Sequence, residues 1–224
     1  MNRPARLQME AVKSPDCKLS VVFARDAPVG LILRRGPSKW VQLILWDTSR
    51  DRFTDGAWFH GRIYEDRCNL SPDGRLFVYF CHGGHSRPGY SDSWTAVSRP
   101  PWLFALGLWP WGTTYGGGGR FMDSRTLVLN IGPGAPLKTH PDHPAKGLNV
   151  CADDSITYSP HPSNPEGLEG VDWSGRDQKG GLVYSRSGVL FRAVNDRLPG
   201  HEIADFRHRK PEPTSAPEWA RKPL

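Results

Sequence analysis

Apolar residues along this chain occur in short runs that are broken every few positions by Gly, Pro, Asp or Ser. Such runs predict β-strands joined by turns, whereas an amphipathic helix would repeat its apolar positions every three or four residues over about ten residues or more. No segment sustains that helical interval. The pattern therefore predicts an all-β protein.

The predicted strands fall into four successive groups of four. The first group comprises 18–25, 30–35, 40–47 and 52–59, and the second 65–70, 75–81, 93–99 and 103–110. The third comprises 119–123, 126–130, 148–152 and 155–159, and the fourth 169–174, 181–186, 189–194 and 201–206. The groups recur about every 50 residues, which is the period of four-stranded propeller blades. Residues 76–80 are all apolar, as expected of a strand covered on both faces.

Three segments are similar to known propeller repeats. SPDGRLFVYF (71–80) resembles the first two strands of a TolB-like blade, which a Ser-Pro-Asp-Gly turn joins. LILWDTSRDRFTDGAWF (43–59) resembles the third strand, Trp-Asp dipeptide and following turn of WD-repeat and TolB-like blades, and MDSRTLVLN (122–130) is similar to a degenerate copy of the first. The resemblance covers residues 14–206 and implies a small β-propeller-like domain of about four four-stranded repeats. A β-sandwich is the alternative fold.

The length, charge and apolar content of the chain indicate how it is divided into regions and which classes of protein it resembles least. The 224 residues accommodate an N-terminal arm (1–16), a single domain (17–206) and a Pro-rich basic tail (207–224). The net charge is +6 and the pI about 9.3, but the basic residues are spread along the chain, which argues against a nucleic-acid surface. No apolar run has the length of a signal peptide or a membrane span. We therefore expect a cytoplasmic protein whose four cysteines are reduced thiols.

The stretch CNLSPDGRLFVYFCHGGH (68–85) places two cysteines and two histidines around a turn. A turn of two or four residues puts Cys68 and Cys81 on the same face of a hairpin, and a turn of three residues reverses this. Structural zinc sites usually contain cysteine pairs separated by about two to four residues, a much shorter spacing than the one found here. The spacing favours cysteines that pack inside a hairpin.

The longest predicted loops are 81–92, 109–119, 131–147 and 160–170. In the propeller families that the chain resembles, such loops share one face, which often carries the ligand or partner site. The resemblance therefore implies one surface that combines His82, His85, His140, Asp142, His143 and His161 with Trp109, Trp111 and Tyr115. Long loops inside a compact domain are often functional.

These loops contain three candidate chemistries. His-x-Asp-His at 140–143 offers ligands that a divalent metal accepts, although the same sequence is also a common polar turn. Trp109-Pro110-Trp111 would form a stacking platform for carbohydrate or peptide, or else pack between blades, which the usual burial of Trp favours. The glycine run 116–119 lacks the Gly-Lys-Ser/Thr of a phosphate loop and predicts positive φ angles or a close backbone approach.

Our first functional expectation is a non-catalytic module that binds a protein or peptide through one loop face, with Trp109, Trp111, Tyr115 and His161 on that face. The alternative is a metal-dependent hydrolase or lyase, in which an ion is held by His82, His85, His140 and His143 and the base is Asp142 or Asp153. A carbohydrate-binding domain is a third alternative. No cofactor other than a divalent metal is suggested, and the oligomeric state stays open.

Overall fold

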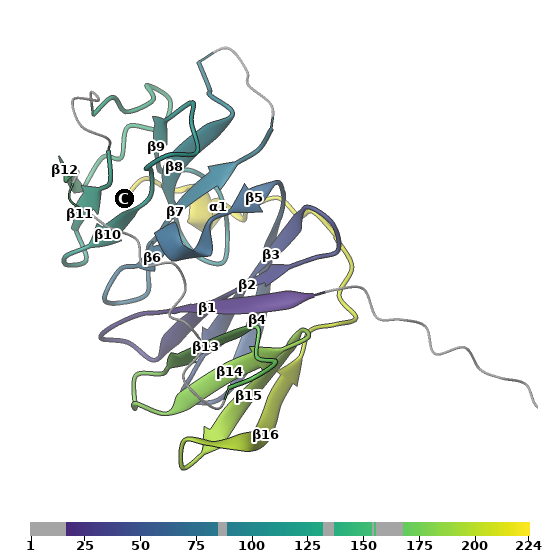
Figure 1. The fold of residues 1–224 in the computed structure, drawn as a ribbon. Helices are drawn as coiled ribbons and strands as arrows, with labels where there is room; N and C mark the ends of the chain where they lie inside the picture. Colours follow the sequence, from purple (N-terminus) through teal and green to yellow (C-terminus); the bar gives the residue numbers. More distant parts are fainter. Residues whose placement is uncertain (1–16, 85–88, 132–136, 154, 156–167) are drawn as a thin grey trace, which may run out of the picture.

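The computed structural model describes residues 17–84, 89–131, 137–153, 155 and 168–224, which form an all-β protein with four sheets (Figure 1). The first sheet contains β1 (Lys18–Phe23), β2 (Val29–Arg35), β3 (Trp40–Asp47) and β4 (Arg52–His60). The second contains β5 (Arg62–Ile63), β6 (Asn69–Leu70), β7 (Phe77–His82), β8 (Ser93–Ser98) and β9 (Gly107–Pro110), with the 3-10 turn η1 (Glu65–Arg67) between β5 and β6.

The third sheet contains β10 (Gly119–Phe121), β11 (Thr126–Leu129) and β12 (Asn149–Ala152). The fourth contains β13 (Trp173–Arg176), β14 (Leu182–Arg186), β15 (Val189–Val194) and β16 (Arg197–Asp205). These four sheets correspond to the four predicted groups of strands. One pairing differs from a simple meander, because β12 runs parallel to β11. Most of the strand expected at 155–159 lies outside the described residues.

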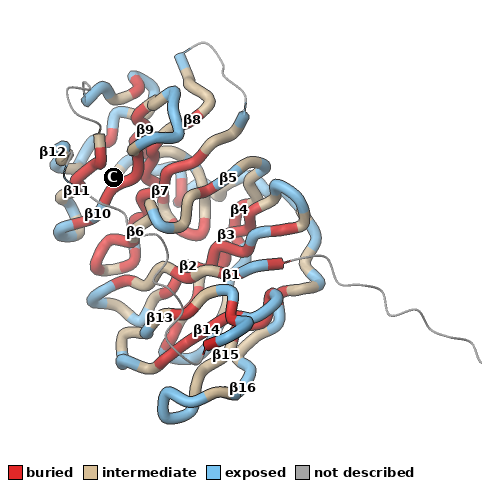
Figure 2. The backbone as a smooth tube through the Cα atoms, viewed as in Figure 1, coloured by how far each residue is buried: buried red, intermediate tan, exposed pale blue. Residues whose placement is uncertain are grey.

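The sheets stack face to face in the order fourth, first, second, third (Figures 1 and 2). Alternate residues of β2 face opposite ways, so that Leu31 and Leu33 pack toward the second sheet and Ile32 toward the fourth. In β7, Phe77 packs toward the first sheet and Val78 toward the third. The two inner sheets are thus covered on both faces, which explains their uninterrupted apolar runs.

Neighbouring sheets also contact one another through edge strands, β13 with β1, β1 with β6 and β6 with β10. The third and fourth sheets lie at opposite ends of the stack (Figure 1). Over the part of the chain that the structure describes, the four sheets therefore form an open stack, with the third sheet at one end and the fourth sheet at the other. None of the described helices is long and apolar enough to cross a membrane.

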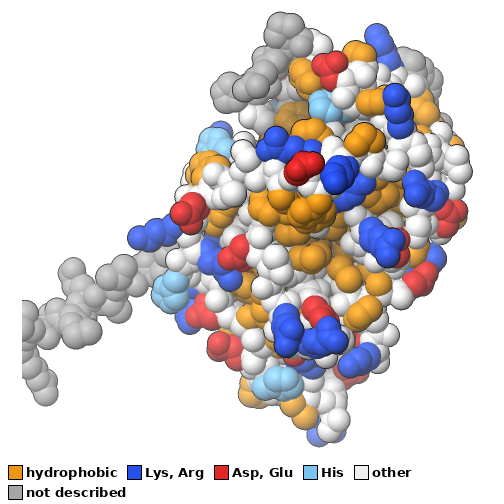
Figure 3. Space-filling model, turned by 180° about the vertical axis from the view of Figure 1, so that it is seen from behind, with side chains coloured by type: hydrophobic (Ala, Val, Ile, Leu, Met, Phe, Trp, Pro, Cys, Tyr) orange, Lys and Arg blue, Asp and Glu red, His pale blue; other side chains and the backbone are white. Residues whose placement is uncertain are grey.

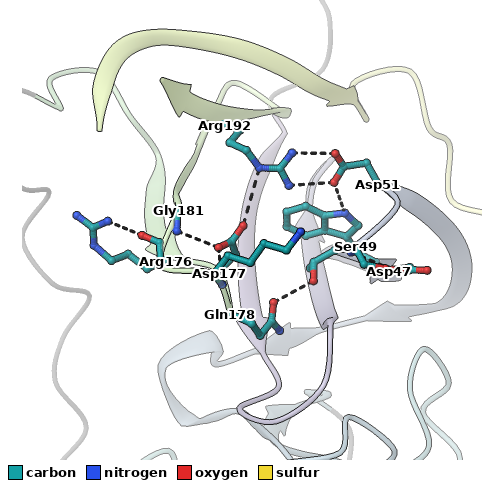
Figure 4. Close-up of polar contacts among 12 residues, drawn as sticks. Asp47, Ser49, Asp51, Arg176, Asp177, Gln178, Gly181 and Arg192 are labelled. Atoms are coloured by element: carbon teal, nitrogen blue, oxygen red, sulfur yellow. Dashed lines mark hydrogen bonds and ion pairs between the residues drawn. The ribbon is translucent and has the colours of Figure 1, made fainter. Parts of the chain in front are cut away.

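Hydrogen bonds and ion pairs connect the first sheet to the fourth sheet (Figure 4). The guanidinium of Arg192 donates to both carboxylate oxygens of Asp51, at 2.8 and 3.0 Å. Asp51 also accepts a hydrogen bond from the indole nitrogen of Trp46 at 3.1 Å. Gln178 donates to the main-chain carbonyls of Ala24 and Val29, at 3.0 and 2.9 Å. These bonds complement the apolar contacts between the two sheets.

The C-terminal segment (207–224) crosses the stack from the fourth sheet to the third and contains the short helix α1 (Glu218–Arg221) (Figure 1). The buried side chain of Arg34 holds its beginning, donating to the carbonyls of Phe206 at 2.8 Å and of Arg207 at 3.2 Å. Leu224 packs against the core between the second and third sheets. The segment is therefore attached to the stacked sheets near its beginning and at its end.

Candidate functional site

A cavity of about 520 Å³ opens between the first and second sheets, and we call it the aromatic cavity. It is lined by Phe59, His60, Tyr79, Gly83, Tyr90, Ser91, Trp94, Leu103, Phe104, Ala105, Leu108 and His143. Its volume and its apolar, aromatic wall are typical of ligand sites, which span about 300 to 1,000 Å³. Among these lining residues none is Lys, Arg, Asp or Glu.

The walls of the aromatic cavity are fixed by strand register and ring packing. Phe59 at the end of β4 meets Trp94 at the start of β8 edge to face, with ring centroids 6.1 Å apart. A Cβ on Gly83 would lie 3.0 Å from the Trp94 ring, so glycine lets the chain pass close to that indole. Tyr79 donates to the carbonyl of Leu103 at 3.4 Å, and burial raises its pKa well above the usual value. The wall therefore presents rigid rings and a neutral phenol.

Tyr90 and His143 form a polar pair at the rim of this cavity. The Nδ1 atom of His143 lies 2.7 Å from the carbonyl oxygen of Ala105, which only accepts hydrogen bonds, so Nδ1 carries the proton. The Nε2 atom is 3.1 Å from the Tyr90 hydroxyl and, in the neutral ring, accepts a hydrogen bond from it. Both nitrogens of His143 are thereby engaged, and the tautomer is set by main-chain geometry.

His140 and His143 lie here because their segment runs beside β9. The amide of His140 donates to the carbonyl of Leu108 at 2.8 Å, and the amide of Leu108 donates to the carbonyl of His143 at 3.2 Å. Residues 140–145 thus follow the outer edge of the second sheet, which differs from the expectation that they extend over a shared loop face. They also meet Tyr90, whose ring stacks on His140 with centroids 4.1 Å apart.

The candidate metal ligands are distributed over several places. His82 ends β7 and lies 3.5 Å from a carboxylate oxygen of Asp92. The Nδ1 atom of His140 accepts the amide of Asp142 at 3.2 Å, yet the Asp142 side chain is 75% exposed and that of His140 only 6%. His85 and His161 lie outside the described residues. Within the described ranges, no three His, Cys, Asp or Glu side chains are grouped to hold a metal ion.

The predicted partner-face aromatics are placed in three different environments. Trp109 is 3% exposed and packs in the core between the second and third sheets. Trp111 is half-buried and its indole nitrogen donates to the carbonyl of Tyr115. Tyr115 itself is 85% exposed. Burial of Trp109 leaves the three rings without a common flat platform.

The glycine run and the hairpin cysteines occupy structural positions. Gly117 has a φ of +79°, and a Cβ there would lie 2.3 Å from the ring of Phe80, which confirms the predicted close approach. The turn after β6 has four residues, since the amide of Ser71 donates to the carbonyl of Leu76. Burial raises the pKa of Cys68 and Cys81 well above the usual range, so both remain thiols packed in the sheet. Asp153, the other predicted base, accepts from Ser155, which lowers its pKa.

No protein-family model matches the chain, and no curated protein or solved structure matches it. The resemblance to TolB-like and WD-repeat blades therefore stays a prediction. Sequence reasoning missed the main members of the aromatic cavity, namely Phe59, Tyr90, Trp94 and Phe104. Each looks like an ordinary strand or loop aromatic, and only the packing of two sheets brings them together.

Proposed function

We propose that the protein is a non-catalytic binding module whose aromatic cavity takes an uncharged, apolar or aromatic side chain of a protein or peptide partner. The observation that carries this proposal is the lining of the cavity by aromatic rings without Lys, Arg, Asp or Glu. Interface hot spots are typically such well-packed aromatic pockets, surrounded by polar groups. The Tyr90 hydroxyl donates to His143, so its oxygen is left at the rim to accept a hydrogen bond from a main-chain amide of the partner.

The exposed surface is consistent with a partner of this kind. Phe104, at the edge of the aromatic cavity, is 37% exposed and lies beneath the guanidinium of Arg221, 5.8 Å from its ring centroid. Seen from behind, apolar side chains gather near the middle of the surface among Lys and Arg side chains (Figure 3). Aromatic grooves favour extended, Pro-rich segments, because these lose little conformational entropy on binding. We therefore expect an extended, neutral peptide segment as the ligand.

The scaffold of the proposed module is a propeller-like arrangement. Support comes from the contacts among edge strands of neighbouring sheets and from the two inner sheets, which are packed on both faces. In this proposal each sheet serves as one blade, and the aromatic cavity lies between two successive blades.

Selection from a random peptide library on the immobilised protein would test the binding function. Enriched sequences should contain Pro or aromatic residues and few charges, and Phe104→Ala should weaken their binding by about tenfold or more. Phe104 is partly exposed, so this change should leave the thermal midpoint nearly unaltered.

Tyr115→Ala is the matched control, because Tyr115 is an exposed aromatic residue outside the cavity. Its peptide binding should equal that of the unmodified protein. Peptides that bind equally well to Phe104→Ala, or that are lost in Tyr115→Ala, would place the binding surface elsewhere and refute the proposal.

A further inference from the structure

A second cavity, of about 390 Å³, lies between the first sheet, the turn before β9 and the C-terminal segment, and we call it the tail cavity. It is lined by Gln42, Asp55, Gly56, Trp58, Trp102, Arg209, Lys210, Glu212 and Thr214. It shares no lining residue with the aromatic cavity. Any ligand that it takes is therefore independent of the partner proposed above.

An unsatisfied acceptor lies in the wall of the tail cavity. Gln42 is 3% exposed, and its side-chain oxygen has no hydrogen-bond partner in the described structure. Its cross-strand neighbours are Arg34 and Trp58. Arg34 donates to main-chain carbonyls, among them those of Phe206 and Arg207, and leaves the side-chain oxygen of Gln42 without a donor. Buried acceptors are normally paired, so a rotation of the Gln42 side chain that turned this covered oxygen into the cavity would let a hydroxyl or amide of a ligand satisfy it.

Two indole rings face the same cavity because β4 and the turn before β9 are joined closely. The amide of Ala57 donates to the carbonyl of Pro101 at 2.9 Å. A Cβ on Gly56 would lie 2.2 Å from that carbonyl oxygen, so the approach requires glycine. Trp58 and Trp102 directly follow these contacts in their segments and are held at one cavity. Each indole offers a broad apolar face with a polar edge.

The charges around the tail cavity balance. Asp55 and Glu212 are acidic and Arg209 and Lys210 basic, and Asp55 forms an ion pair with Arg209. A balanced wall gives no net attraction for an anion or a cation. It does offer both donors and acceptors to a neutral polar ligand.

A sugar ring matches this combination, because one of its faces is made of C–H groups that stack on an indole while its hydroxyls donate and accept. We propose that the tail cavity is a binding site for a neutral saccharide. In this site the ring stacks on Trp58 or Trp102, and the oxygen of Gln42 accepts a hydroxyl.

NMR of the nitrogen-15-labelled full chain tests this proposal through the indole N–H signals. Those of Trp58 and Trp102 are assigned from Trp58→Phe and Trp102→Phe. The probes are glucose, galactose, mannose, N-acetylglucosamine and their β1,4-linked dimers, each added up to about 50 mM, well above a millimolar Kd. At least one probe should shift one or both of these indole signals with saturation. If no probe shifts them, the proposal is wrong.

Gln42→Leu keeps the size of the side chain and removes the acceptor. Affinity for the active probe should fall by about tenfold or more, while the thermal midpoint stays the same or rises, since an unpaired buried acceptor is lost. Trp219→Ala, on the exposed face of α1 and outside both cavities, should bind like the unmodified protein. Undiminished binding by Gln42→Leu would overturn the assignment. Phe104→Ala should also leave saccharide binding intact, which separates this site from the aromatic cavity.

Discussion

Gly117 and Gly180 have the same φ of +79° but very different surroundings. A Cβ at Gly117 would lie 2.3 Å from the ring of Phe80, whereas nothing lies within 4 Å of one at Gly180. Gly117→Ala should therefore lower the free energy of unfolding by about 3 kcal/mol, from backbone strain and overpacking together. Gly180→Ala should cost only about 1 kcal/mol, from backbone strain. Urea denaturation of both variants measures the difference, and equal losses would contradict the close approach of Gly117 to Phe80.

The ionised side chain of Asp51 makes the free energy of unfolding depend on pH. The hydrogen bonds from Arg192 lower its pKa, and desolvation only partly opposes them. Because the folded pKa lies below the unfolded value of about 3.9, the contribution is fully present above that pH and is lost as the pH falls through the folded pKa. Asp51→Asn should be less stable at pH 7, on the order of 1 kcal/mol for this partly exposed pair, and the difference should shrink below about pH 4.

Thermal midpoints measured between about pH 7 and pH 3 for the unmodified protein and Asp51→Asn follow this contribution. Asp26→Asn is the control, because Asp26 pairs with its exposed neighbour Arg25 and not across sheets. It should have a smaller effect at neutral pH. A difference between Asp51→Asn and the unmodified protein that stays constant with pH would show that Arg192 does not act through the Asp51 charge.

At the level of elements, Arg34 is a buried polar attachment for the beginning of the C-terminal segment. It is fully buried on β2 and donates to carbonyls of that segment, and burial lowers its pKa. Arg34→Met removes these donors and leaves the carbonyls unpaired, so unfolding free energy should fall by about 2 to 4 kcal/mol. Limited proteolysis within 207–224 should accelerate in parallel. Arg35→Met, at the exposed next position of the strand, should change neither quantity appreciably.

Sequence patterns predicted strands in all four sheets, because residues there follow alternation or continuous burial. They missed the two-residue strand β5 and expected a strand over 65–70, where residues 65–67 form η1. They did not predict that β12 runs parallel to β11, since the local apolar pattern carries no information on pairing direction. They also placed residues 131–147 on a loop face, whereas main-chain bonds from His140 and Leu108 align part of that segment with β9. The aromatic cavity escaped prediction for a related reason. Phe59, Trp94 and Phe104 come from separate segments, and only sheet packing joins them.

For the whole molecule, the stacking order predicts a gradient of local stability. Strands β2 and β7 belong to the inner sheets and are buried almost throughout, while β12 and β16 at the two ends are largely exposed. Amide hydrogen exchange should therefore be slowest in β2 and β7 and much faster in β12 and β16. Mass spectrometry of peptides from each sheet provides the measurement. Equal protection across the four strands would mean that the stack opens only as one unit.

The position of segment 140–145 also affects how readily two copies of the protein can associate through the edges of their sheets. A strand at the rim of a sheet exposes unpaired amides and carbonyls that another chain can extend into an aggregate. On β9 the amide and carbonyl of Leu108 are occupied by the carbonyl of His143 and the amide of His140, and just before β9 the carbonyl of Leu106 accepts from Ala145. Part of the rim of β4 is likewise occupied, because Ala57 donates to Pro101. The long connection that allows β12 to run parallel to β11 thus also shields the second sheet from edge-to-edge association.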